Sequence, residues 1–151
     1  MNKKASIYFV ITAIIIIVAG FIDRYVNKDN GNFVLNVYDT YYVAARFHIA
    51  QFIFIIYAFL GAGYWVFNKL RLGLNKQLTA VHTFASIAGV VLYWMVFLYS
   101  LFRKETPYGL MSISNADFLE LWVIRIVVIV TLVQPLYLIN FVIGIIKRNK
   151  I

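Results

Sequence analysis

Four long stretches without a charged residue constrain this chain more than any other feature. They cover residues 5–22, 47–68, 77–102 and 126–146, which are 18, 22, 26 and 21 residues long. About 20 consecutive apolar residues allow a helix to cross the hydrocarbon core of a bilayer. The sequence therefore predicts an all-α integral membrane protein, with four transmembrane helices at about 5–23, 40–67, 77–101 and 118–146.

The connections between these helices are short, so we expect a single membrane domain over residues 1–151, folded as an up-down-up-down bundle. The short connection 68–76 predicts that the second and third helices are antiparallel neighbours. The first stretch follows two lysines but lacks a small-x-small cleavage site, which favours a retained helix over a signal peptide. Pro135 is expected to kink the last helix.

The basic residues predict how the helices are oriented. One side of the predicted bundle carries Lys3, Lys4, Lys69, Arg71, Lys76, Lys147, Arg148 and Lys150. The other side carries Arg24, Lys28, Arg103 and Lys104, and all six acidic residues lie on or near it. The positive-inside rule then places both termini in the cytoplasm, in what we expect to be a bacterial cytoplasmic membrane. The net charge of +8 indicates orientation in a membrane and not a nucleic-acid partner.

The segment from Asp39 to His48 carries ionisable groups at the outer mouth of the second predicted helix. Charged or titratable side chains at such a position are costly and are often functional. Arg46 and His48 are two residues apart, about 200° around a helix, so they are expected to face opposite sides. The chain has only one other histidine, His82.

This segment, Asp-Thr-Tyr-Tyr-Val-Ala-Ala-Arg-Phe-His, resembles a motif of subunit I of the haem–copper (cytochrome c and quinol) oxidases. The motif, Asp-Thr-Tyr-Tyr-Val-Val-Ala-His-Phe-His, opens the tenth helix of that family, and Ala44 and Arg46 are the two departures here. The resemblance continues through Gly61-Ala62-Gly63-Tyr64-Trp65 to Pro107, about half of the chain. It implies that the four predicted helices are similar to the last four of that subunit.

The resemblance also implies a set of site residues. His48 matches the ligand of the low-spin haem, so it is the candidate axial ligand of a b-type haem iron. Arg46 stands where the family has the ligand of the second haem. Arg103 and Lys104 fall where the family has arginines that contact haem propionates. Arg46 is an alternative candidate for that contact.

Histidine and cysteine counts exclude several functions. With no cysteine and two histidines, the chain has no thiolate metal site and too few ligands for a haem–copper centre. Oxygen reduction by this chain alone is therefore excluded, no copper is expected, and we do not expect an enzyme. His48 and His82 should differ in depth by roughly 10–20 Å, too much to share one iron. A second ligand would come from another copy, a partner subunit, Met95 or Met111.

Three functions remain open at this point. The first is a small respiratory-chain membrane protein, either an accessory subunit or a haem b electron carrier beside a terminal oxidase or quinol-oxidising complex. The second is a cofactor-free structural or assembly subunit that binds oxidase helices, in which His48 is only a hydrogen-bonded polar residue. The third is a protein that binds quinone or lipid through its aromatic outer ends. Each is compatible with a homo-oligomer, and all involve membrane lipid.

The remaining buried charges need partners. For Arg46 the sequence offers Asp39 on nearly the same helix face, Asp117 or Glu120 from the last helix, or a haem propionate or lipid phosphate. Arg125 is expected to pair with those last two acids or to snorkel. His82 is interpreted as an interfacial, structural histidine near Lys76.

Overall fold

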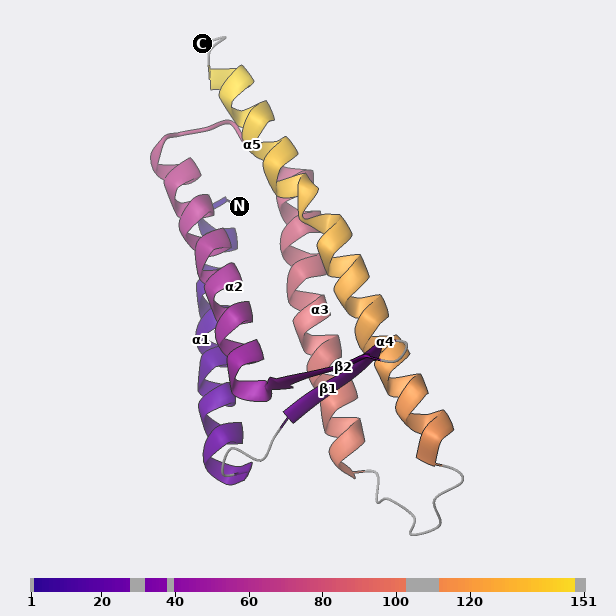
Figure 1. Ribbon diagram of the computed structural model, residues 1–151. Coiled ribbons are helices and arrows are strands. Elements are labelled where there is room, and N and C mark those ends of the chain that lie inside the picture. Colours follow the sequence, from indigo (N-terminus) through magenta and orange to yellow (C-terminus); the bar gives the residue numbers. More distant parts are fainter. Residues whose placement is uncertain (1, 28–31, 38–39, 103–111, 149–151) are drawn as a thin grey trace.

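The computed structural model describes residues 2–27, 32–37, 40–102 and 112–148. Its elements are α1 (Asn2–Asn27), β1 (Asn32–Val37), β2 (Thr40–Ala45), α2 (Arg46–Lys69), α3 (Lys76–Phe102), α4 (Ser112–Val133) and α5 (Pro135–Arg148). Figure 1 shows the helices as a bundle, with both termini toward the same end. Four helical segments of the described chain are long and apolar enough to cross a membrane, as the sequence predicts.

The last predicted helix is interrupted at Pro135, where the sequence predicts a kink. Helix α4 ends at Val133, and α5 begins at the proline, which has no backbone N–H to continue the hydrogen-bond ladder. The backbone N–H of Gln134 bonds instead to the Thr131 carbonyl at 3.1 Å, one residue closer than in an α-helix. Figure 1 shows that α4 and α5 still form one long segment beside α3.

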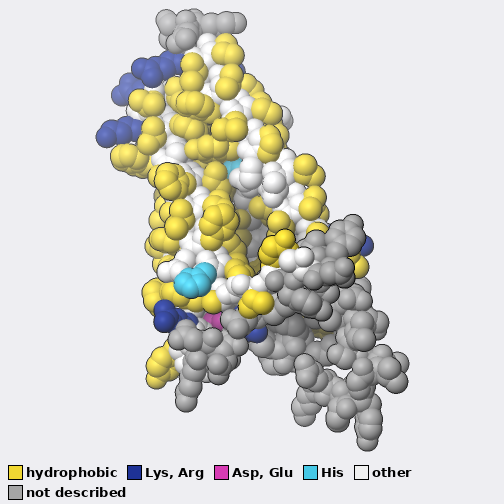
Figure 2. Space-filling view, viewed as in Figure 1, with side chains coloured by type: hydrophobic (Ala, Val, Ile, Leu, Met, Phe, Trp, Pro, Cys, Tyr) yellow, Lys and Arg dark blue, Asp and Glu magenta, His cyan; other side chains and the backbone are white. Residues whose placement is uncertain are grey.

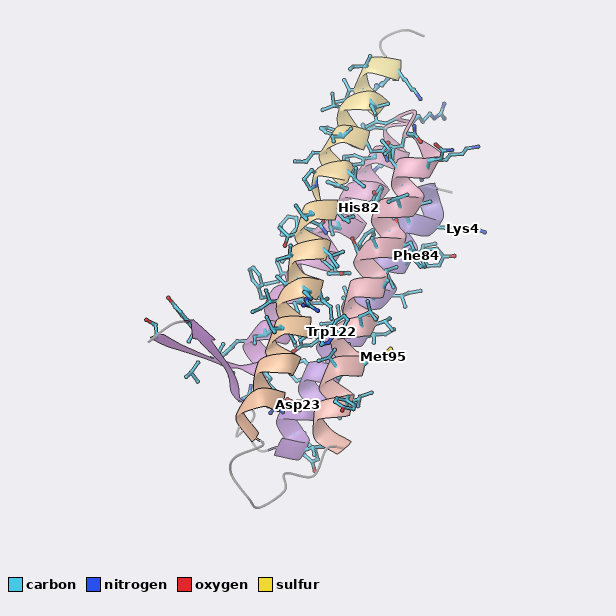
Figure 3. The ribbon with its side chains drawn as sticks, turned by 90° about the vertical axis from the view of Figure 1, so that its right-hand side faces the viewer. Lys4, Asp23, His82, Phe84, Met95 and Trp122 are labelled. Carbon is cyan, nitrogen blue, oxygen red and sulfur yellow. The ribbon has the colours of Figure 1, made fainter. Side chains whose placement is uncertain are left out.

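The prediction that a helix begins near residue 40 is wrong, because residues 40–45 form a strand. Strand β2 pairs antiparallel with β1, with Val37 opposite Thr40 and Asn32 opposite Ala45. Threonine, valine and aromatic residues in both segments favour strands, and pairing between the segments satisfies their backbone groups. The hairpin projects sideways from the bundle in Figure 3, so α2 starts only at Arg46.

The core lies where α1 packs along α2. Helix α1 buries Ala5, Phe9, Ala13 and Ile16, which recur at the three- or four-residue spacing of one helix face. They meet Tyr57, Gly61, Tyr64 and Phe67, which share a face of α2 for the same reason. At Gly61 a methyl group in place of the hydrogen would lie 2.9 Å from the Val10 Cγ2 atom, so the absence of a side chain lets the two helices approach.

The second and third predicted helices, α2 and α3, meet through their side chains. In the described chain α1 packs more closely against α2 than against α3. Two tyrosines of α2 make these side-chain contacts. The Tyr57 hydroxyl donates to the Ser86 carbonyl at 2.6 Å, and the Tyr64 hydroxyl contacts His82 Nδ1 at 3.0 Å. These two aromatic side chains thus link α2 to α3.

The outer surface of the bundle is strongly apolar. Exposed side chains include Phe52, Phe59, Phe84, Met95 and Leu132, each more than 60% exposed. Figure 2 shows hydrophobic side chains over most of the middle of one face. Such an extended apolar surface is unusual for a protein in water and fits helices of a membrane protein.

Candidate functional site

His48 lies in the first turn of α2 with its side chain exposed. Its Nδ1 atom is 3.0 Å from the Oε1 atom of Gln51, one turn further along the helix. A proton on Nδ1 would donate to this amide oxygen, because an amide oxygen only accepts hydrogen bonds. In a neutral imidazole this would leave the lone pair on Nε2, the atom that could then bind a metal or haem iron.

Arg46 faces away from His48, which confirms that the two side chains lie on different sides of the helix. Its Nη1 atom lies 3.7 Å from the Oδ1 atom of Asp23 near the end of α1. The side chains of Arg46 and Asp23 are 31% and 16% exposed, so this ion pair lies at the edge of the bundle. Asp23 is a partner that the sequence analysis missed. Asp39, and the side chains of Asp117 and Glu120, lie outside the described residues.

A cavity of about 410 Å³ begins at this ion pair. Its walls come from the first half of α2 and the second halves of α3 and α4, and α1 contributes Ile16, Gly20 and Asp23. Figure 2 shows the face on which the molecule is hollowed between α2 and α4. The lining is mostly apolar, with Asp23 and Arg46 at one end, Gln134 and Thr131 at the other, and Tyr57, Tyr93 and Trp94 among its aromatic residues. His48 does not line it.

His82 lies in a buried polar network at the other end of the molecule. It is 0% exposed, and Figure 3 shows it far along the bundle from Asp23. Its Nε2 atom is 3.2 Å from Gln134 Oε1, and Nδ1 faces the Tyr64 hydroxyl. The Gln134 amide nitrogen bonds to the Val130 carbonyl, which fixes the orientation of the amide. His82 therefore donates from Nε2 and accepts from Tyr64 at Nδ1.

This arrangement places His82 inside the bundle, with the hydrogen bonds expected of a structural histidine. The neutral ring has both nitrogens hydrogen-bonded, and it packs against Phe9 and Tyr137 with ring centroids 5.4 and 5.6 Å away. Tyr64, which touches His82, is sixteen residues after His48 along α2, or about 24 Å of helix. The two histidines are therefore too far apart to hold one iron.

A second polar cluster ties the start of α3 to α5. Asn140 is 1% exposed; its Nδ2 atom donates to Thr79 Oγ1 at 2.8 Å, and its Oδ1 atom accepts from the Asn75 backbone N–H at 2.7 Å. Sequence reasoning missed Asn140 and Gln134, although each is an uncharged polar residue within a long apolar stretch. Polar side chains of that kind commonly hydrogen-bond between membrane helices, which is the signal that points to them.

The remaining predicted site residues are not brought to His48 by the described structure. Arg103, Lys104 and Met111 lie outside the described residues. Met95 is 61% exposed on α3. Arg125 is also exposed, and its guanidinium lies 5.3 Å from the centre of the Trp122 ring. Over the part of the chain that the structure describes, no three His, Asp or Glu side chains gather as a metal site.

As a haem site, His48 thus supplies one ligand and an exposed face. The contact between Nδ1 and Gln51 is of the kind that commonly orients a histidine that binds a metal. Arg46 points toward Asp23 and the cavity, which does not favour a contact with propionates at His48. A haem on this face would lie between the chain and a neighbouring protein.

Comparisons of the chain with protein-family models, with curated proteins and with solved structures found no match. The likeness of residues 36–107 to oxidase subunit I is therefore a resemblance of sequence segments alone. What the chain does must be inferred from its own residues and their geometry.

Proposed function

We propose that this chain is a small, non-catalytic subunit of a respiratory-chain membrane complex, and that it shares a haem b with a neighbouring protein through His48. The neighbour is a terminal oxidase, a quinol-oxidising complex or a second copy of the chain. The four helices cross a bacterial cytoplasmic membrane up-down-up-down with both termini inside. Apolar helices and the concentration of lysine and arginine on one side support this placement.

The observation that carries the proposal is the state of His48. It lies exposed at the end of a helix whose outer face is apolar, with Nδ1 hydrogen-bonded to Gln51. Imidazole is a standard axial ligand of b-type haem, and the resembling motif has a haem ligand at the matching position. The second axial ligand comes from the neighbour, because His82 is buried and fully hydrogen-bonded elsewhere.

The residues of this chain would have separate roles in such a site. His48 would hold the iron and Gln51 would orient the ring, while Arg103 and Lys104 would contact the propionates, as the resemblance implies. A bound haem supplies reversible one-electron transfer. A chain with these roles carries electrons or completes a partner's site, and it does not reduce oxygen itself.

The test is a reduced-minus-oxidised spectrum of the full chain, purified with its neighbours in a mild detergent. We expect a b-type α-band that is lost in His48→Ala and retained in His82→Gln, the matched change at the other histidine. The proposal is wrong if the wild-type protein is colourless, or if the band survives in His48→Ala.

A cofactor-free subunit is the second candidate, and the same geometry favours it in one respect. The exposed pair of His48 and Gln51 can hydrogen-bond a neighbouring membrane helix without any metal. A colourless protein that still copurifies with oxidase subunits, and loses them in His48→Ala, would support this function instead.

A further inference from the structure

We propose that the β1–β2 hairpin docks on the lipid surface, where it lies flat against the membrane at the end of the bundle at which α2 begins. The face that meets the lipid is the one to which Tyr42 belongs. This inference rests on the membrane placement of the chain and is independent of haem. The depth, the direction, the residue pattern and the free edges of the hairpin each support it.

The depth of the hairpin follows from the ends of two candidate membrane spans. One span ends at Val26 in α1, and the other begins at Arg46 in α2. The contact of Arg46 Nη1 with Asp23 Oδ1 at 3.7 Å holds these two ends close to one level. Asp23 is only three residues before Val26, or about 4.5 Å of helix. Strand β2 ends at Ala45, so the hairpin leaves the bundle within about one helical turn of the membrane surface.

The hairpin runs across the bundle and not along it. Figures 1 and 3 show it directed sideways from the start of α2. A strand of six residues is about 20 Å long, whereas packed helices lie about 8–10 Å apart. Because the helices cross the membrane, an element of this length and direction extends along its surface and reaches the lipids around the bundle.

Neither face of β2 is covered by the bundle. Side chains of successive strand residues point to opposite faces, and Thr40, Tyr42, Val43 and Ala44 are all exposed. Tyr42 and Val43, one on each face, are 59% and 62% exposed. Apart from β1, the strand contacts chiefly α2, which follows it directly in the chain. A two-stranded hairpin is marginally stable by itself in water, so we expect a surface outside the bundle to cover one of its faces.

The pairing register distinguishes the two faces. Residues directly opposite each other in a ladder belong to the same face. One face is apolar or aromatic apart from a single threonine, and its residues are Phe33, Leu35, Val37, Thr40, Tyr42 and Ala44. The opposite face, which includes Val43, contains both asparagines of the strands, Asn32 and Asn36. Neither strand contains a charged residue. Aromatic and aliphatic residues on one face and amides on the other are typical of an element at a membrane–water interface.

The free edges of the hairpin place it at the surface of the membrane and not within the hydrocarbon. Within the described residues the sheet has two strands, so each strand pairs on one side only. The outward N–H and C=O groups of an edge strand have no partner in the sheet. In hydrocarbon such groups would be unsatisfied at high cost, whereas water among the lipid headgroups can hydrogen-bond to them. A flat position at the interface lets the Tyr42 face contact lipid while the edges contact water.

The test uses the absence of cysteine from the chain, which allows a single spin label in each variant. Tyr42→Cys and Val43→Cys are matched neighbours on opposite faces. The labelled full-length protein is reconstituted in vesicles of phosphatidylglycerol and phosphatidylcholine. Electron paramagnetic resonance then measures collisions of the label with oxygen, which concentrates in lipid, and with a water-soluble nickel chelate. We expect the oxygen-to-nickel ratio to be several-fold higher at position 42 than at position 43. Phe59→Cys, 75% exposed on α2, and Gly73→Cys, between α2 and α3, give the lipid and water references.

A second pair of variants keeps the label at position 42 and adds a charge. Ala44→Asp places a carboxylate on the same face as the label, and Val43→Asp places one on the opposite face. A charge is costly in lipid. The oxygen-to-nickel ratio should therefore fall several-fold, toward the value at position 73, in the Ala44→Asp variant and stay unchanged in the Val43→Asp variant.

Several results would overturn the inference. Equal ratios at positions 42 and 43 would mean that the two faces have the same surroundings. Low collision rates with both reagents would mean that protein covers the hairpin, and equal responses to the two aspartates would exclude a lipid-facing side. If Tyr42→Cys does not fold by circular dichroism, Ala44→Cys on the same face replaces it, and a water-like ratio there would again refute the docking. A water-like ratio at Phe59→Cys would refute the membrane placement itself, which separates the two failures.

Discussion

The two ends of the helix bundle are held together by different chemistry. Around His82, buried hydrogen bonds link α2, α3 and the α4–α5 junction, and aromatic rings fill the space between them. Around Arg46, one ion pair at the edge links α1 to α2, and a cavity separates α2 from α3 and α4. The same helices are thus sealed at one end and hollow at the other. We therefore expect substitutions at the His82 end to lower stability more than substitutions at the Arg46 end.

The largest loss of folding stability should come from a substitution that separates α1 from α2 near the His82 end. In Gly61→Leu the new side chain would meet Val10 and Phe9, because a Cβ atom there already lies 3.3 Å from the Val10 backbone nitrogen. Overpacking of this kind costs about 1–3 kcal/mol of folding free energy. Ala62→Leu, at an exposed neighbour, is the control. Unfolding in detergent by a denaturant measures both, and equal stabilities would contradict the close approach.

A change at His82 should come next. In His82→Leu, the Tyr64 hydroxyl and the Gln134 Oε1 atom lose their shared partner inside the bundle. An unsatisfied buried polar group costs about 1–3 kcal/mol, with the lower end expected for membrane helices. The thermal midpoint of unfolding in detergent should therefore fall. If His82→Leu is as stable as the wild-type protein, the hydrogen-bonded network does not hold the sealed end.

The hollow end should respond less. Arg46→Gln removes the ion pair with Asp23, whose two side chains are 31% and 16% exposed. After screening by solvent such a pair contributes about 0.2–1 kcal/mol. The loss of stability should shrink as salt is added, whereas the loss in His82→Leu should not change. A salt-independent effect at Arg46 would mean that the pair is more deeply buried than the structure has it.

The smallest effect is expected at Thr83, beside His82 on α3. Its Oγ1 atom is buried and has no hydrogen-bond partner among the described residues. Thr83→Val replaces this hydroxyl with a methyl group of similar size, so stability should stay the same or rise slightly. Comparison with His82→Leu in the same unfolding assay shows which polar groups of the sealed end contribute. A clear loss in Thr83→Val would reveal a partner for the hydroxyl.

Local patterns in the sequence were sufficient to predict the helices and the position at which the last one is interrupted. Charge-free stretches predict the four helical segments, and the missing N–H of Pro135 predicts where the last one is interrupted. Helical geometry alone places Arg46 and His48 on opposite faces. The strand at 40–45 was missed because it forms by pairing with residues 32–37, and such pairing depends on another segment as much as on local preference.

For the candidate site, too, the sequence predicted some residues and missed the contacts between helices. His48 could be identified from its segment, since a titratable residue at a helix mouth is conspicuous in a chain with two histidines. The partnership of Arg46 with Asp23, and the role of Gln134 beside His82, depend on which helices meet. Those contacts join residues 23 and 52 positions apart in the chain, and no local pattern specifies them.

By itself, the sequence determined how many apolar helices the chain forms, because backbone hydrogen bonds close within each helix and depend on local residues. Only the tertiary structure decided that His48 faces outward, that His82 is sealed inside, and that a cavity lies between α2 and α4. The physical reason is that packing is set by side-chain shapes across helices. Tyr57 and Tyr64 link α2 to α3 through hydrogen bonds, while Gly61 lets α1 approach α2.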